Sequence, residues 1–391
     1  MKFKWSFLLV LFLTGIILIN SPAWSKEKPE KFFIGDQIKL QSTVLNEERQ
    51  IFIYTPFGYD RVQTKYPVLY VLDGGGHFHH VSGIVQFFTA QGLTPGLIVV
   101  AIPNTDRQRD FTPTKVLDIP SSGGADNFLK FLQAELFPYI EENYRTQPYR
   151  ILAGHSLCGL FAIYTLLTHS DWFNAYIAIS PWLLYDDNSL LKRAPGLLEK
   201  LPSANKFLYM TAGNEPNLLP ILNRFTALLK DKAPDGLEWN YVEMENENHG
   251  SVVHLTVYNG LLELYRDWQL PRDLGQDAVA ALNAHYQKLS EKFGYQVEPS
   301  EAFINRLGYM ILAQNMFDQA IAVFKYNIEK YPNSANVYDS LGEALEGNNQ
   351  LELALENYKI AVEKGKKLKD PNLEIYKTHI DRVQQKFAGV K

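Results

Sequence analysis

Apolar runs without polar alternation recur through the first two-thirds of the chain, most clearly at residues 66–73 and 96–103. Such runs are typical of strands that are buried on both faces, as in a parallel sheet covered by helices. The predicted strands of this sheet are residues 66–73, 96–103, a short run at 151–153, 175–180, 206–212 and 238–244. Residues 37–45 and 49–55 precede them and predict a hairpin that turns at residues 46–48.

Helical patterns separate these strands. In the segment 126–144, for example, apolar residues recur at four-residue spacing, which predicts a helix with one buried face. The predicted helices are residues 77–91, 126–144, 189–201, 217–230 and 252–268. Strands that alternate with helices predict a doubly wound, mostly parallel α/β fold, here over residues 30–270. A long polar loop is expected at residues 104–124.

The character of the chain changes at Pro271. Residues 271–300 are predicted to form a helical linker built on one amphipathic helix, 277–293. From residue 301 to 391 a repeat of 34 residues is visible. The recurring pairs are Leu307 and Leu341, Gly308 and Gly342, Ala320 and Ala354, and Phe324 and Tyr358. This period predicts tetratricopeptide helix pairs, whose core the flanking helices must complete because two repeats are too few.

The N-terminus has the pattern of a targeting segment. Lys2 and Lys4 precede an apolar stretch at residues 7–19, and residues 21–25 resemble a cleavage site. We therefore expect a signal peptide over residues 1–25 and a periplasmic or secreted mature protein that no longer binds the membrane. The alternative is an uncleaved anchor, for which the apolar stretch is short.

Composition narrows the class of protein. The formal net charge is −5 and no basic run occurs, so nucleic acid is a poor candidate partner. A hydrophobic content of 46% is sufficient for a large core. Cys158 is the single cysteine, which excludes an intramolecular disulfide and suits a bacterial periplasm.

The candidate chemistry centres on Ser156, which lies between an apolar run and a buried helical segment. This is the layout of a nucleophile elbow, a tight strand-to-helix turn that requires small residues two positions before and after the serine. Gly154 meets that requirement, and Cys158 occupies the position of the second glycine. The alternatives are a purely structural turn, or Cys158 as a rival nucleophile whose side chain should point into the fold.

A serine nucleophile needs a base and an acid, which in this architecture follow it in the order serine, acid, histidine. His249 follows the last predicted strand and is the expected base. Glu215 follows the strand at 206–212 and is the expected acid, which would hold the imidazole in one tautomer. The other candidate acids are Asp186, Asp187, Glu245 and Glu247, or the site has no acid.

An oxyanion hole requires two N–H donors. By position, Leu157 supplies one of them. The glycines after the strand at 66–73 allow close approach of the backbone, so Gly75 is the expected second donor and Gly76 the next candidate.

Other polar residues should surround the pocket. His77 is followed by His79 and His80, a pattern that could hold zinc, but the sequence shows no fixed carboxylate or cysteine partner, and we expect no metal. Arg107 and Arg109 could bind an anionic or polyhydroxylated ligand, or could order their loop through acidic neighbours. We expect Arg107, Arg109, His77 and Trp182 to contact substrate.

Five motifs occur in a fixed order: L-D-G-G-G-H-F, I-P-N-T-D-R-Q-R-D-F-T-P, A-E-L-F-P-Y-I-E-E-N-Y, G-H-S-L-C-G-L-F and N-H-G-S-V. Over residues 30–270 the chain thereby resembles the putative esterase (esterase D-like) family of α/β-hydrolases, which includes siderophore trilactone esterases, feruloyl esterases and S-formylglutathione hydrolase. The second motif most resembles the siderophore esterase branch, and bacterial members with a tetratricopeptide tail are similar to the whole chain.

The resemblance implies Ser156 as nucleophile, His249 as base and Leu157 as an oxyanion donor, and it is compatible with Glu215 as acid. Two features depart from the family pattern: Cys158 replaces the usual glycine, and most siderophore esterases lack the tail. The expected function is an exported carboxylic ester hydrolase that works on a small-molecule ester without a cofactor. The alternatives are an acyltransferase or peptidase with the same residues, or an inert fold whose tail binds a protein or peptide partner.

Overall fold

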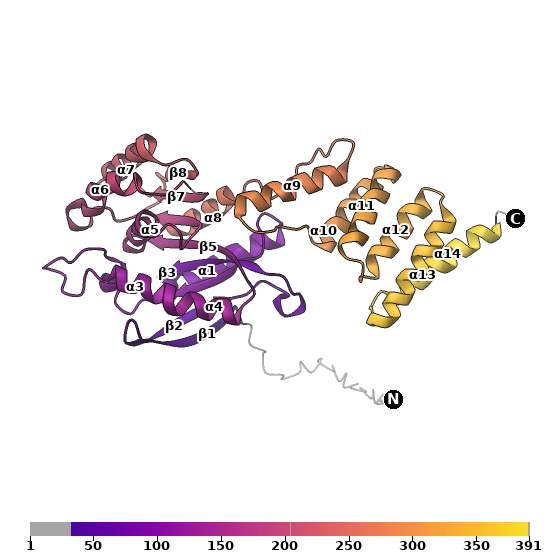
Figure 1. Ribbon diagram of the computed structural model, residues 1–391, viewed down its shortest axis with the longest axis horizontal. Coiled ribbons are helices and arrows are strands. Elements are labelled where there is room, and N and C mark those ends of the chain that lie inside the picture. Colours follow the sequence, from indigo (N-terminus) through magenta and orange to yellow (C-terminus); the bar gives the residue numbers. More distant parts are fainter. Residues whose placement is uncertain (1–32, 204, 390–391) are drawn as a thin grey trace, which may run out of the picture. The chain divides into compact units, whose positions relative to one another are not determined.

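The computed structural model describes residues 33–203 and 205–389, and Figure 1 shows the order of its elements along the chain. The expected signal peptide at residues 1–25 lies outside the described residues. An eight-stranded sheet has the order β1-β2-β4-β3-β5-β6-β7-β8. Its strands are β1 (Asp36–Ser42), β2 (Glu47–Tyr54), β3 (Tyr66–Leu72), β4 (Ile98–Ile102), β5 (Thr146–His155), β6 (Ala175–Ile179), β7 (Lys206–Ala212) and β8 (Leu237–Glu243).

Strands β3 to β8 run parallel, whereas β1 pairs antiparallel with β2, and β2 pairs antiparallel with β4. The predicted doubly wound α/β fold with a leading hairpin is therefore confirmed. Because the carboxyl ends of parallel strands lie at one edge of a sheet, the loops after β3, β5, β7 and β8 meet there. That edge, which we call the catalytic edge, carries the predicted site residues.

Side chains of the central strands alternate between two cores, which explains why these strands are apolar throughout. In β3, Tyr70 and Leu72 belong to one core, and Leu69 and Val71 belong to the other. The first core is closed by α3 (Ala125–Phe131), η2 (Leu132–Leu136), α4 (Phe137–Asn143), α5 (Leu157–Thr168), α6 (Tyr185–Leu198) and α7 (Leu219–Lys232). The second core is closed by α1 (Gly74–Ala90), α8 (Val252–Leu264) and part of α9 (Ala278–Phe293).

The segment predicted as one helix over residues 126–144 contains a π turn, η2, between α3 and α4. Pro138 lies just after this turn, and it can donate no hydrogen bond to the carbonyl four residues earlier. Within the π turn, the Glu135 carboxylate accepts hydrogen bonds from Ser42 and Thr43 at the end of β1. The interruption of the helix thus connects it to the hairpin.

Two short elements complete the α/β part of the chain. The turn η1 (Tyr59–Arg61) precedes β3, and α2 (Arg107–Phe111) lies within the segment predicted as a polar loop. The Asp106 carboxylate caps α2 by accepting a hydrogen bond from the Arg109 N–H at 2.9 Å. This local cap explains why a polar segment forms a helical turn.

The C-terminal helical region comprises α10 (Glu301–Leu312), α11 (Phe317–Lys330), α12 (Asn336–Gly347), α13 (Leu351–Leu368) and α14 (Leu373–Gly389). The predicted 34-residue repeat corresponds to a repeated contact. A Cβ atom on Gly308 would lie 2.5 Å from the Phe324 ring, and one on Gly342 would lie 2.5 Å from the Tyr358 ring. Each glycine therefore allows the first helix of a pair to approach an aromatic ring of the second. The tetratricopeptide assignment itself stays a prediction.

Helix α9 contributes to two cores. Leu289 and Phe293 pack with the second core of the sheet, whereas Ala278 and Leu282 pack with residues of α10 and α11. This is the bridging position that the amphipathic pattern predicts. Among the residues that the structure describes, no helix combines the length and the apolar character that a membrane span requires.

Candidate active site

Ser156 lies at the turn between β5 and α5, at the catalytic edge. Its backbone has φ 61° and ψ −112°, a strained conformation for a residue with a side chain. Three backbone hydrogen bonds of 2.9 Å hold the turn: the Ser156 N–H donates to the Ile179 carbonyl, and the Ser156 carbonyl accepts from the N–H groups of Leu160 and Trp182. The strain is therefore imposed by the surrounding backbone, as a nucleophile elbow requires.

Glycines on both sides of Ser156 make the turn sterically feasible. A Cβ atom on Gly154 would overlap the Cys158 carbonyl group, and one on Gly159 would lie 2.8 Å from the Pro181 Cα. Cys158 itself is fully buried, and burial raises the pKa of its thiol well above the usual value. A buried neutral thiol is a poor nucleophile, so the geometry favours Ser156 over Cys158.

Glu215 and His249 lie together at the ends of neighbouring strands. The Nδ1 atom of His249 is 2.5 Å from a Glu215 carboxylate oxygen. The other carboxylate oxygen accepts hydrogen bonds from the Ser180 hydroxyl at 2.5 Å and from the Gly213 N–H at 3.0 Å. Both oxygens are thus engaged, which fixes the carboxylate beside the imidazole. Nδ1 is then assigned as the protonated nitrogen, which leaves Nε2 free to accept a proton.

The other candidate acids have different neighbours. Asp186 accepts a hydrogen bond from the Thr114 hydroxyl at 2.6 Å, and Asp187 forms an exposed ion pair with Lys192. The backbone carbonyl of Glu247 accepts a hydrogen bond from the Asn214 N–H, which connects the loops that carry the acid and the base. Of the candidates, Glu215 is the one that the structure places against His249.

The side chain of His249 is 41% exposed and lies beside residues that flank the serine. The His155 ring, one position before Ser156, has its centroid 4.5 Å from that of His249. The Trp182 ring lies 6.2 Å from His249, and the Trp182 N–H is bound to the Ser156 carbonyl. These contacts place His249 and Trp182 next to the elbow.

The expected oxyanion donors lie in the first turns of two helices. Leu157 begins α5, and Gly75 is the second residue of α1, so their N–H groups have no carbonyl partner earlier in the same helix. The glycines at 74–76 were predicted to precede a helix that starts at residue 77; instead they form its first turn. Gly74 is required there because a Cβ atom would overlap the backbone at Ile102.

Arg107 connects the two loops that carry these donors. Its Nε and Nη2 atoms donate to the Asp73 carboxylate at 2.8 and 3.0 Å, and Nη2 also donates to the His155 carbonyl at 2.9 Å. Burial tends to raise the pKa of Asp73, but the hydrogen bonds and the charge of Arg107 outweigh it and hold the pKa below its usual value. Asp73 directly precedes the α1 glycines, and His155 directly precedes Ser156.

Arg109 points into an ion-pair network. Its guanidinium donates to Asp110 and Glu47 at distances between 2.6 and 3.0 Å. The fully buried Arg49 donates to the same two carboxylates at 2.7 and 2.8 Å. All three Arg109 nitrogen groups are engaged, so its contacts match the alternative in which this arginine orders its loop.

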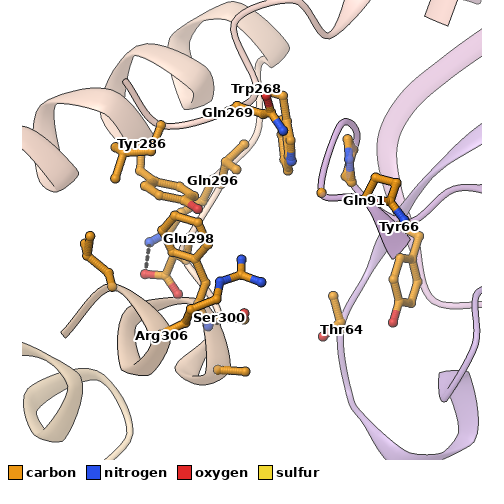
Figure 2. Close-up of a pocket in the computed structure, with 18 of the residues that line it drawn as sticks. Thr64, Tyr66, Gln91, Trp268, Gln269, Tyr286, Gln296, Glu298, Ser300 and Arg306 are labelled. Carbon is orange, nitrogen blue, oxygen red and sulfur yellow. Dashed lines mark hydrogen bonds between the residues drawn. The ribbon is translucent and has the colours of Figure 1, made fainter. Parts of the chain in front are cut away.

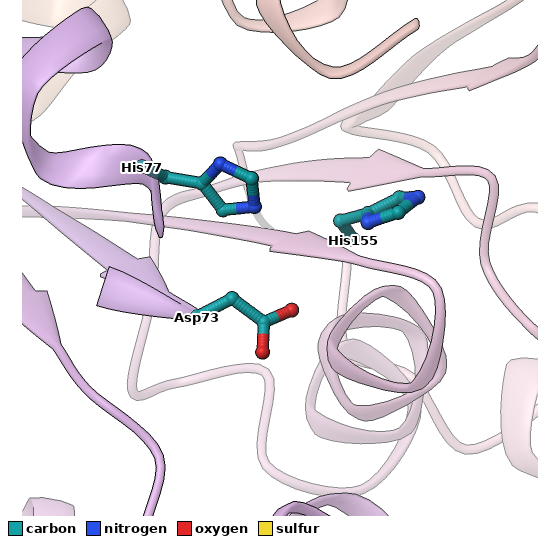
Figure 3. Close-up of side chains that lie close together, drawn as sticks. All are labelled: Asp73, His77 and His155. Carbon is teal, nitrogen blue, oxygen red and sulfur yellow. The ribbon is translucent and has the colours of Figure 1, made fainter. Parts of the chain in front are cut away.

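His77 and His155 lie near Asp73, as Figure 3 shows, and one potential metal-ligating atom from each of these residues lies within 4.8 Å of the others. Burial lowers the pKa of His155 to about 4, with a further contribution from the nearby His249, and burial also lowers the pKa of His77. These imidazoles are therefore neutral near pH 7. Both Asp73 oxygens are bound to Arg107, whose positive charge disfavours a cation at that point.

Three residues of the site were not predicted from the sequence. Asp73 and His155 each lie close in the sequence to a predicted residue. Their shared partner Arg107, however, lies 34 residues from Asp73 and 48 residues from His155. Ser180, which orients Glu215, has φ 41° at the end of β6, and its N–H donates to Thr211. A polar residue at the carboxyl end of a buried strand was the available signal for each of them.

A large cleft occurs away from this site. It has a volume of about 1080 Å³ and is lined by residues at the amino ends of β3 and β4 and by residues of α9 and α10. Figure 2 shows Tyr66 and Gln91 on one side, with Tyr286, Glu298 and Arg306 on the other. Because Ser156 follows the carboxyl end of β5, this cleft and the elbow lie at opposite edges of the sheet.

Known proteins have similar sequences. The model of the family described as "Putative esterase" matches residues 42–214. The ferri-bacillibactin esterase BesA of Bacillus subtilis (strain 168) is 29% identical over 261 residues, which is 58% of this chain and 88% of that protein.

Two solved structures extend the similarity. An IroE-like serine hydrolase from Shewanella oneidensis is 30% identical, with a TM-score of 0.69 over 75% of this chain and 99% of that chain. An uncharacterised protein from Capnocytophaga ochracea DSM 7271 is 19% identical, with a TM-score of 0.64 over 90% of this chain and 99% of that chain. At that identity the likeness concerns the fold, and its coverage reaches beyond the sheet into the helical region.

Proposed function

This chain belongs to the putative esterase family of α/β-hydrolases and is a carboxylic ester hydrolase, and from that premise we propose that it acts through an acyl-enzyme on Ser156, with His249 as base and Glu215 as acid. The main support is the Glu215–His249 pair at 2.5 Å beside a serine with a strained backbone. Neither feature is needed for a stable sheet, and both are features that the activation of a serine hydroxyl group requires.

In the proposed reaction, the Ser156 Oγ attacks the ester carbonyl carbon while His249 Nε2 takes the hydroxyl proton. The N–H groups of Leu157 and Gly75 stabilise the negative charge on the carbonyl oxygen. His249 then gives the proton to the leaving alcohol, and the acyl group stays on Ser156. A water molecule, deprotonated by His249, releases the acid and restores the serine. None of these steps uses a metal or an organic cofactor.

The carboxylate of Glu215, whose side chain is 10% exposed, has two tasks in this scheme. It keeps the Nδ1 proton on His249, and it stabilises the imidazolium that forms when Nε2 is protonated. His155 is compatible with this charge because its low pKa keeps the neighbouring ring neutral. Trp182, beside His249, and His77, beside His155, are proposed to contact the substrate. We assign Arg107 to the positioning of the oxyanion loops.

For the substrate, we propose an ester bond of a siderophore, because several relatives are named as siderophore esterases. We also propose export to the periplasm or the medium, on the strength of the charged and apolar pattern of residues 1–25. The C-terminal helical region is proposed to serve as a surface for a protein or peptide partner, as tetratricopeptide repeats commonly do.

The first test is intact-mass spectrometry after treatment with a fluorophosphonate. We expect one adduct on the wild-type protein and on Ser203→Ala, which removes an exposed serine far from the elbow along the chain. The Ser156→Ala variant should give no adduct and should lose at least about 10⁴-fold in kcat. An adduct on Ser156→Ala, or none on the wild type, would contradict the mechanism.

The substrate is tested by comparing kcat/KM for ferri-bacillibactin, a feruloyl ester and p-nitrophenyl butyrate. A preference of at least about tenfold for the siderophore, which corresponds to about 1.4 kcal/mol in the transition state, would support the proposed class. Equal values for all three would leave the mechanism intact and exclude siderophore specificity.

A further inference from the structure

Histidine rings form a row that begins at the base, His249, and ends at the exposed His254. His249 neighbours His155, and His155 neighbours His77 at a ring-centroid distance of 6.3 Å. The row continues from His77 to His80 at 5.2 Å and from His80 to His254 at 5.3 Å. The last two rings, on α1 and α8, have no task in ester hydrolysis as proposed above.

The Nδ1 atoms of His80 and His254 face each other at 3.3 Å. This separation is longer than the usual N–H donor distance of about 2.7–3.2 Å. It agrees with the edge of a zinc coordination tetrahedron, because two nitrogens that each lie about 2.0–2.1 Å from a tetrahedral ion are about 3.3–3.4 Å apart. The Nδ1–Nδ1 separation is therefore compatible with one ion bound to both nitrogens.

His77 gives His80 the hydrogen-bonding partner that a metal ligand usually has. The His80 Nε2 atom is 3.0 Å from His77 Nδ1, with the two rings nearly perpendicular at 83°. If His80 Nε2 carries the hydrogen and donates it to His77, then His80 Nδ1 is left with a lone pair. Ligating histidines typically donate their second N–H in this way, which fixes both the tautomer and the orientation of the ring.

The two helices that carry the pair are firmly packed. Phe88 of α1 and Tyr258 of α8 form an edge-to-face contact with centroids 4.7 Å apart. Val81 of α1 and Val253 of α8 lie in the same buried core, each next to one of the histidines. Ligands on rigid, packed elements bind a metal with little loss of conformational entropy.

We propose that His80 and His254 form a binding site for one divalent transition-metal ion of the zinc type, with His77 as the partner that orients His80. Imidazole ligands favour zinc, copper and nickel over magnesium and calcium, which prefer oxygen. The remaining coordination positions face solvent, because His254 is exposed, and they are open to water or an anion. The alternative group, Asp73 with His77 and His155, is disfavoured by the Arg107 guanidinium bound to Asp73.

The test uses the untagged mature protein and measures Zn²⁺ binding by competition with a chromophoric chelator, together with the visible absorbance of bound Co²⁺. We expect one bound ion per chain for the wild type and at least a tenfold weaker affinity for His80→Ala and His254→Ala. His77→Ala should weaken binding about 10–100-fold, the typical cost of losing such a partner. His169→Ala removes a histidine whose ring contacts Trp172 after α5 at a tilt of 47°, and this variant should bind the ion as the wild type does.

His254 is exposed, so its removal should leave the fold intact, and an unchanged thermal melting curve for His254→Ala verifies this. Equal Zn²⁺ affinity in the wild type and in His254→Ala would overturn the proposal, as would equal losses in His254→Ala and His169→Ala. Binding of Mg²⁺ with the same affinity as Zn²⁺ would also overturn it. Because the readout is metal binding, the result does not depend on esterase activity.

Discussion

The catalytic edge of the sheet and the C-terminal helical region are assembled from contacts of different range. Ser156, Glu215 and His249 follow three different strands, and they meet because those strands run parallel in one sheet. In the helical region, Gly308 packs on Phe324 in the next helix, and Gly342 repeats the contact with Tyr358. The comparison teaches that the site depends on the whole sheet, whereas each helix pair depends on its immediate neighbours.

Replacement of the acid should have the largest effect, a loss of activity at the catalytic edge with no change in the C-terminal helical region. Glu215→Gln keeps the shape of the side chain but removes the charge that stabilises the imidazolium and selects its tautomer. We expect kcat for an ester substrate to fall about 10³–10⁴-fold, with unchanged hydrogen exchange in α10–α14. Measured by steady-state kinetics, a loss below about tenfold would exclude Glu215 as the acid and direct attention to Glu245 and Glu247.

A smaller loss of activity is expected when Arg107 is replaced by lysine. Arg107→Lys retains the charge, but a lysine cannot bind Asp73 and the His155 carbonyl at once through a planar fork. The two oxyanion loops should become less well aligned, so kcat should fall about 10–100-fold while KM changes little.

Arg109→Lys, on the same short helix, is the matched control for that prediction. It disturbs the ion pairs with Glu47 and Asp110 and should therefore lower the melting temperature, while kcat stays close to the wild-type value. A change in KM alone for Arg107→Lys would instead indicate that Arg107 contacts the substrate.

The helical region can be perturbed separately through Gly342→Ala. Alanine is ordinarily better than glycine in a helix by about 1 kcal/mol. Here the added methyl group would lie 2.5 Å from the Tyr358 ring, and the overlap should reverse the sign, with a net loss of about 1–2 kcal/mol in the free energy of unfolding. Gly196→Ala in α6 is the control, because nothing lies near its Cβ position and no loss is expected. Chemical denaturation measures both, and kcat at 25 °C should stay unchanged.

The smallest expected effect is a pH dependence confined to the helical region. His379 donates to the Asp339 carboxylate at 2.9 Å, and this hydrogen bond raises the pKa of His379 above its usual value of 6.5. The stabilisation is therefore complete below that value and is lost as the pH rises through the pKa of the folded state. Hydrogen exchange in α12–α14 should therefore accelerate in the wild type as the pH rises above about 6.5, beyond the intrinsic rate change.

His379→Gln should remove that additional acceleration, at a cost of at most about 1 kcal/mol. The same pH response in both proteins would contradict the assignment. Exchange in the strands of the sheet serves as the internal reference. In the described part of the chain, the polar partners of His379 are Asp339 and Glu343, which both lie in α12.

Much of the fold was predictable because its signals are local. The apolar runs of β3 and β4 and the 34-residue spacing of Gly308 and Gly342 each lie within a short segment or repeat at a fixed interval. Glu215 and His249 were predicted from their position after strands, and the structure places them in contact. The roles proposed for them still await the experiments above.

The remaining features arise from contacts that no short segment contains. Arg109 has acidic neighbours in its own loop, but its partner Glu47 is 62 residues earlier in the chain. The pattern of His77, His79 and His80 showed no partner in the sequence, because His254 is 174 residues from His80. The π turn before Pro138 is an intermediate case, since the proline is visible in the sequence while the hydrogen bonds to Ser42 and Thr43 are not.

The complete burial of Cys158 has a practical consequence. It is the single sulfhydryl of the chain, and it lies two residues from Ser156 beneath the turn. A thiol-labelling reagent can reach it only when the segment around Ser156 opens, so the labelling rate in native buffer reports the free energy of that local opening. Cys158 is thus a built-in probe of the turn at Ser156. The fraction of molecules that gain the mass of one label gives the fraction in which this turn has opened.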